Sequence, residues 1–272
     1  DIMNQNYLKK IALLFLLFPL TVVAQTPQQI EEIKKETNVV KLQELAKALE
    51  IKARKAKQKA WDLADVNGWE KTYTDSNGAF NELIKVTEDG QPIYYKTNNT
   101  KTSKFRSYLF RSNVTAARAT RANWLHNGGG LGLDVEGQGM TAHVWDGGIA
   151  RVTHQEYDGI GGDNRVSLGD SGSLNFHAAH VMGTIVSSGV VASAKGMAPQ
   201  GKGIAFDWTS DESEATIASA NGMLISNHSY GYRADQIPDQ WFGAYRGEAR
   251  QWDEIMYNAP YYLQVTSAGN DG

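Results

Sequence analysis

After Gly128-Gly129-Gly130, short apolar segments alternate with helical segments along the rest of the chain. The expected strands are residues 140–145, 203–206, 223–227 and 261–267, and the expected helices between them are residues 176–188, 212–221 and 245–257. Strands that alternate with helices form βαβ units, in which the strands lie parallel and helices cover the sheet. We therefore predict an α/β fold for residues 128–272, with functional groups at the carboxyl ends of the strands.

The preceding region, residues 25–115, has a different pattern. Apolar residues at mostly helical spacing run from Pro27 to Trp69, and Asn67-Gly68 ends this run. Residues 79–97 read as two strands around a Glu-Asp-Gly turn, which is typical of a hairpin. The polar stretch 97–107 lacks an apolar period and is a candidate linker. A helical and β-hairpin region is thus expected before the α/β region.

Charge is unevenly distributed between these regions. Residues 25–130 carry 18 basic and 12 acidic side chains, a net charge of +6, whereas residues 131–272 carry 7 and 17, a net charge of −10. Opposite charges favour two units that dock on one another, although a basic helix face in solvent would give the same count. Nucleic acid is not expected as a partner of the acidic region, because phosphate contacts need a basic surface.

The beginning of the sequence is typical of an exported protein. Lys9 and Lys10 precede an apolar run of 14 residues, Ile11–Ala24, which ends in small residues before Gln25. This pattern predicts a signal peptide over residues 1–24 and a secreted protein. The run is shorter than the roughly 20 residues that span a bilayer, so no membrane association is expected after its removal. Because the sequence has no cysteine, disulfides and cysteine–zinc sites are excluded.

Asp146 is the first candidate for chemistry. It ends the expected strand 140–145 and is followed by Gly147-Gly148, which let the backbone turn sharply. An acid in this position either forms the turn or orients another side chain of a site.

The stretch SLNFHAAHVMGTIVSSG, residues 173–189, carries two histidines three residues apart. Asn175 is a natural N-cap, which places His177 in the first turn of the expected helix, where it suits a general base. His177 and His180 could also be two metal ligands, but zinc helices usually place histidines four apart with a glutamate between them. We therefore expect no metal, and we expect His180 to be a buried, hydrogen-bonded histidine.

A short GDSG sequence, which contains Ser171, resembles a fragment of the chymotrypsin-type proteases. That fold requires the histidine to precede the serine, whereas Ser171 precedes His177. Ser171 is therefore expected to be a loop residue.

Two further segments follow expected strands. Asn270 lies in a glycine-flanked turn, where it either aims its amide at a site or serves the turn itself. The strand near residue 225 leads into Ser229-Tyr230-Gly231, which offers a bare backbone edge.

Five short motifs, in this order, resemble those of the subtilisin-like serine proteases. They are Asp146-Gly147-Gly148-Ile149, the His177–Thr184 segment HAAHVMGT, GMAP at 196–199, NHSYG at 227–231 and SAGNDG at 267–272. The resemblance covers about residues 128–272 and implies a subtilisin-like parallel sheet flanked by helices. Gly147 replaces the usual Thr or Ser, and Ala178-Ala179 replaces Gly-Thr, changes that leave the carboxylate and the imidazole in place.

The family's nucleophile lies in a Gly-Thr-Ser-Met-Ala motif, which this sequence does not contain. We therefore expect an incomplete catalytic domain whose serine lies beyond residue 272. The resemblance implies that Asp146 orients His177, that His177 moves the serine proton, and that the amide of Asn270 stabilises the oxyanion. It also implies that Ser229–Gly231 pairs with an extended substrate, with Tyr230 lining the specificity pocket.

By position and charge, residues 25–115 are interpreted as a pro-region that is an intramolecular partner of the enzyme. The expected substrates are proteins or peptides, and no cofactor is required. The resemblance allows calcium for stability, and surface acids such as Asp158, Asp163 and Asp170 are available as ligands. Their spacing in the sequence does not match that of a calcium-binding loop. Two alternatives stay open: an inactive peptide-binding relative, and a secreted metal-dependent hydrolase that uses Asp146, His177 and His180.

Overall fold

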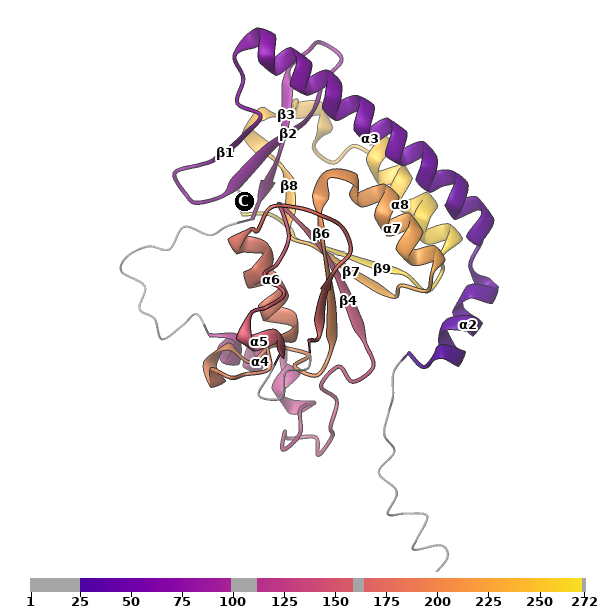
Figure 1. The fold of residues 1–272 in the computed structure, drawn as a ribbon, viewed down its shortest axis with the longest axis vertical. Coiled ribbons are helices and arrows are strands. Elements are labelled where there is room, and N and C mark those ends of the chain that lie inside the picture. Colours follow the sequence, from indigo (N-terminus) through magenta and orange to yellow (C-terminus); the bar gives the residue numbers. More distant parts are fainter. Residues whose placement is uncertain (1–24, 99–111, 159–163, 271–272) are drawn as a thin grey trace, which may run out of the picture.

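The computed structural model describes residues 25–98, 112–158, 164–270, so the expected signal peptide and most of the expected linker lie outside the described residues. Two parts of the chain pack side by side (Figure 1). We call residues 25–98 the N-terminal unit and residues 112–270 the α/β unit. Within the described ranges, no helix combines the length and the apolar character needed to cross a bilayer.

The elements of the N-terminal unit are α2 (Pro27–Glu36), α3 (Val39–Asn67), β1 (Thr72–Thr74), β2 (Phe80–Val86) and β3 (Pro92–Thr97). The apolar run expected as one helix is therefore broken. Thr37 is extended and ends α2, and the Asn38 side chain caps α3 by accepting a hydrogen bond from Lys41 N at 3.2 Å. The end of α3 at Asn67 agrees with the prediction, since Gly68 takes the left-handed conformation with φ of 71°.

The predicted hairpin is confirmed, but it belongs to a larger sheet. β2 and β3 pair antiparallel, and β1 adds to the free edge of β2. On the other edge, β3 pairs antiparallel with β8 (Tyr230–Tyr232), a strand of the α/β unit. The sheet order β1-β2-β3-β8 therefore joins segments more than 130 residues apart. The sequence pattern did not predict β1. It predicted residues 230–232 as part of one strand, 224–232, whereas the structure divides this segment into β7 (Ile225–His228) and β8.

The α/β unit confirms the predicted α/β architecture. Its parallel strands are β4 (Thr141–Asp146), β5 (Val166–Leu168), β6 (Lys202–Asp207), β7 (Ile225–His228) and β9 (Leu263–Thr266). Its helices are α4 (Asn113–Thr120), α5 (Gln155–Asp158), α6 (Phe176–Val186), α7 (Asp211–Ala220) and α8 (Gly247–Asn258). The strand order is β5-β6-β4-β7-β9, so β4 is the central strand. β5, which has three residues, was not predicted.

Helices cover both faces of this sheet because the side chains of β4 alternate between two cores. Val144 packs with Met182 of α6 on one face. Trp145 packs on the other face in a cluster that includes Ile255 of α8. Both Val144 and Trp145 are buried, as expected for a central parallel strand.

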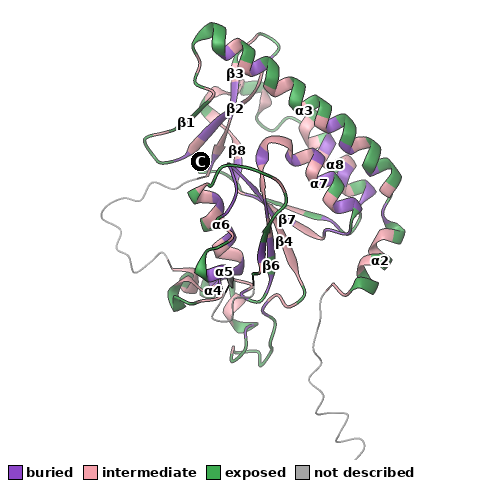
Figure 2. Ribbon diagram, viewed as in Figure 1, coloured by how far each residue is buried: buried purple, intermediate pink, exposed green. Residues whose placement is uncertain are grey.

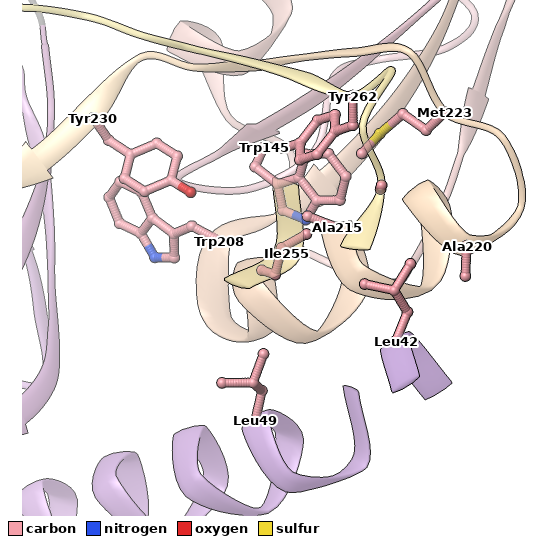
Figure 3. Packing of buried hydrophobic residues seen from close by; sticks show 11 residues of the cluster. Leu42, Leu49, Trp145, Trp208, Ala215, Ala220, Met223, Tyr230, Ile255 and Tyr262 are labelled. Atoms are coloured by element: carbon pink, nitrogen blue, oxygen red, sulfur yellow. The ribbon is translucent and has the colours of Figure 1, made fainter. Parts of the chain in front are cut away.

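The second of these cores is shared between the two units. Leu42 and Leu49 of α3 join the cluster that contains Trp145 and Trp208 of the α/β unit (Figure 3). Figure 2 shows the buried parts of α3 where it lies against α7 and α8, with its outer side exposed. Helix α3 is thus part of the core and not only a solvated helix.

Ion pairs between the units agree with the predicted docking of opposite charges. Lys41 of α3 lies 3.5 Å from Glu254 of α8, and Lys85 of β2 pairs with Glu248 of the same helix. Such partly exposed pairs each contribute little, so the apolar contacts of α3 account for most of the attraction between the units.

Shortening Leu42 to alanine is expected to lower the free energy of unfolding by about 2–5 kcal/mol, because Leu42 is fully buried in the shared core. Val66→Ala on the same helix is the control, since Val66 is 83% exposed and its loss should change stability by less than about 0.5 kcal/mol. Urea denaturation of both variants measures this. Equal stability of the two would show that α3 does not hold the units together.

Candidate active site

Asp146 and His177 form a hydrogen-bonded pair at the carboxyl end of the central strand. The Nδ1 atom of His177 lies 2.8 Å from Oδ2 and 2.9 Å from Oδ1 of Asp146. The Asp146 side chain is fully buried, and that of His177 is 11% exposed. The predicted proximity is confirmed. Since Nδ1 faces the carboxylate, Nε2 is the ring nitrogen that can serve a reacting group.

Two features of the backbone hold this pair in place. Gly147 N donates to Asp146 Oδ1 at 2.7 Å, which gives one oxygen of the buried carboxylate a hydrogen-bond donor. Gly148 has φ of 133°, and a Cβ atom there would lie 2.4 Å from Ser173 O. Only glycine therefore fits the turn that carries the chain away from Asp146.

Asn175 connects the turn after β4 with the helix that carries the histidine. Its Oδ1 accepts hydrogen bonds from His177 N at 2.7 Å and Ala178 N at 3.2 Å, which confirms the predicted N-cap. Its Nδ2 donates to Gly147 O at 2.8 Å. One side chain thus fixes the start of α6 relative to the end of β4.

The electrostatics of the pair follow from its burial. Desolvation raises the pKa of Asp146 above its ordinary value, while the hydrogen bond from His177 opposes the rise. A carboxylate in this setting is stabilised most by a cationic neighbour. The buried carboxylate binds the ring through Nδ1 and leaves Nε2 available for proton transfer, as a general base requires.

The expectation that His180 is buried is wrong. His180 is exposed and lines a cavity of about 530 Å³, together with Phe176 and Thr184 of α6 and His154 before α5. This cavity is also bordered by residues 112–113 at the start of α4 and by Glu156 and Tyr157 of α5. Partial desolvation and the neighbouring His177 lower the pKa of His180. In the described part of the chain, no three His, Cys, Asp or Glu side chains converge on a metal position.

The backbone edge at residues 229–231 is occupied by β3 of the N-terminal unit. The side chain of Tyr230 is buried, and its hydroxyl donates to Asp211 Oδ2 at 2.6 Å. Tyr230 therefore does not line an open pocket here, because the alternation of β8 turns its ring inward, where it contacts Tyr95 of β3 at 5.2 Å between ring centroids.

The remaining predicted residues lie farther from the pair. Asn270 is exposed beyond the end of β9. Ser171 is an exposed residue between β5 and α6, as predicted for a loop. Asp170 Oδ1 accepts a hydrogen bond from Asp207 N at 3.0 Å, while Asp163 lies outside the described residues.

Sequence reasoning missed a group of acids behind the site. Asp211, Glu212 and Glu214 occupy the first turn of α7, where the helix dipole favours negative charge. Burial raises the pKa of all three, and that of Glu214 to about 7, although Glu214 also accepts a hydrogen bond from Trp145 Nε1 at 2.9 Å. Their helical spacing was visible in the sequence, but nothing local indicated burial.

Comparison with family models, with curated proteins and with solved structures gives no match to this chain.

Replacing Asn175 by alanine should lower the free energy of unfolding by about 1–2 kcal/mol, because α6 loses its N-cap. Asn175→Ser is the matched variant, since serine restores the capping acceptor but not the hydrogen bond to Gly147 O. We expect Ser to recover most of the loss in thermal or urea denaturation. Identical losses for both variants would mean that the cap contributes nothing measurable.

Stability should fall as the pH rises from about 4.5 to about 7, because the folded chain holds a proton on Glu214 that the unfolded chain releases near the ordinary pKa of 4.5. Glu214→Gln removes this term and keeps an oxygen acceptor for Trp145. Between pH 5 and pH 8, the free energy of unfolding of the variant should rise by on the order of 1–3 kcal/mol relative to that of the original chain. Glu32→Gln, on the exposed surface of α2, is the control. Parallel pH profiles from urea denaturation for all three proteins would contradict the assignment.

Proposed function

We propose that the α/β unit belongs to an exported, subtilisin-like serine endopeptidase, with Asp146 and His177 as two members of its triad. The observation that carries the proposal is the 2.8 Å contact between His177 Nδ1 and the fully buried carboxylate of Asp146. A buried carboxylate that orients an imidazole at the carboxyl end of a parallel strand suits acyl transfer. The residues of the sequence motifs give the proposal its family.

In the proposed mechanism, His177 takes the proton of a serine hydroxyl through Nε2 and later gives it to the leaving amine. Asp146 keeps Nδ1 protonated and stabilises the imidazolium that forms. The serine is proposed to come from sequence outside the 272 residues, since the expected motif for it is missing from them. Asn270, at the carboxyl end of β9, would donate its amide to the oxyanion.

The N-terminal unit is proposed to act as a pro-region. The pairing of β3 with β8 supports this role, because β8 is the edge to which a peptide substrate would add as a strand. A substrate and β3 would compete for the same backbone hydrogen bonds. The leader sequence of residues 1–24 supports export of the whole chain.

Substitution of His177 in the full-length protein tests the function. We expect His177→Ala to lower casein hydrolysis by several orders of magnitude, Asp146→Asn by about 10⁴-fold, and Asn270→Ala by about 10²–10³-fold. His180→Ala is the control, because His180 lies on α6 but lines a cavity whose lining includes neither Asp146 nor His177. It should retain most of the activity.

A fluorophosphonate probe gives an independent measurement. It should label the full-length protein at serine and should not label residues 1–272 alone. Labelling or casein cleavage by residues 1–272 would mean that the nucleophile is a serine of this segment, with Ser171 and Ser229 the first to replace. Peptide binding by the full-length protein without labelling or cleavage would favour the inactive peptide-binding relative.

A further inference from the structure

The last residues of the N-terminal unit lie along β8 in the orientation of a bound peptide. Residues 95–97 pair antiparallel with residues 230–232. The pairing extends past the end of β3, since Asn98 N donates to Ser229 O at 3.1 Å. Four consecutive residues, 95–98, are therefore held by backbone contacts to the edge that leads to the candidate active site.

Alternate side chains of this segment face the α/β unit. Tyr95 lies among three aromatic rings, with centroids 5.6 Å from Trp208, 5.2 Å from Tyr230 and 5.1 Å from Tyr232. Such a site accepts a flat ring by edge and face contacts, and it leaves a void if the ring is absent. Lys96, between Tyr95 and Thr97, lies 3.9 Å from Asp75 of its own unit.

Thr97 lies directly beside the catalytic pair. It is fully buried, and its hydroxyl accepts a hydrogen bond from Phe80 N at 2.9 Å. A Cβ atom on Gly147 would lie 2.9 Å from the Thr97 methyl group, so the missing side chain of Gly147 makes room for it. Gly147 in turn binds Asp146, the partner of His177. A small β-branched side chain fits this space, and a larger one would collide with the turn after β4.

Asn98 is the first residue past Thr97. Its backbone reaches Ser229, and its Nδ2 donates to Ser267 Oγ. Ser267 N is itself held by His228 O at 3.0 Å. The amide of Asn98 is thus bound at the carboxyl ends of β7 and β9. The Ser267 hydroxyl donates to His228 O at 3.4 Å, so it offers a lone pair to the Asn98 amide, and a carboxylate in that place would lack a donor.

We propose that residues 95–98 occupy the positions that precede the cleaved bond of a substrate, so that the enzyme prefers the pattern aromatic–any residue–Thr–Asn and cleaves its own chain after Asn98. This inference rests on the proposed function. The serine oxygen bonds to the Asn98 carbonyl carbon, and the C–N bond breaks as the leaving amine takes the proton from His177. Water then hydrolyses the ester, which leaves a carboxylate on Asn98 and the serine free.

Fluorogenic peptide amides test the preference with the full-length, self-processed protein. Tyr-Lys-Thr-Asn linked to aminomethylcoumarin should be cleaved with kcat/KM at least about tenfold higher than the peptides with Ala for Tyr, Phe for Thr, or Asp for Asn. Exchange of Lys for Ala should have little effect, since Lys96 pairs with Asp75 of the N-terminal unit and does not join the aromatic cluster around Tyr95. Equal rates for all five peptides would overturn the inference and leave the proposed function standing.

The processed chain gives the second measurement. Amino-terminal sequencing should find a new terminus directly after Asn98, and Asn98→Asp should slow its appearance at least about tenfold. Asn77→Asp, in the turn before β2, is the matched control and should process normally. A terminus elsewhere, or equal rates for the two variants, overturns the inference. Failure of the proposed function is a separate outcome: no peptide and no casein is cleaved, and His177→Ala behaves as the original protein does.

Discussion

The fully buried carboxylate of Asp146 sets the geometry of the centre of the molecule. Burial of a charged group costs free energy unless hydrogen bonds compensate it, and here His177 and Gly147 supply them. Both donors require a tight turn after the central strand and a helix that starts beside it. Asn175 meets that requirement by capping α6 and binding the turn. The position of the His177 imidazole is therefore a consequence of satisfying one buried acid.

The contact between the two units has the same character as a single hydrophobic core. Trp145 and Trp208 of the α/β unit are covered by Leu42 and Leu49 of α3, and the units share a sheet through β3 and β8. One buried polar pair crosses this contact, since Trp208 Nε1 donates to Glu82 Oε2 at 2.6 Å. The segment that reaches the Asp146–His177 pair is thus held both by strand pairing and by the packing of an entire helix.

The local elements of both units were largely predictable. The parallel strands and helices after residue 128 follow from alternating apolar segments, and the cap at Asn175 follows from its residue type. The proximity of Asp146 and His177 could also be predicted, because Asp146 ends a parallel strand and His177 begins a helix, and in such folds helices that follow the strands begin near the edge where the strands end. The three-residue strands β1 and β5 were missed, since segments so short have no period to detect.

The sequence by itself determined the longer helices and strands after residue 128, the α/β class and the residues at the strand ends, because each depends on chemistry within a few neighbouring positions. Only the tertiary structure decided that His180 faces a surface cavity, that Tyr230 is buried, and that β3 pairs with β8. These outcomes depend on contacts between residues far apart in the chain. Backbone hydrogen bonds of an edge strand carry no residue-specific signal, so the partner of β8 could be identified only after the two units had packed together.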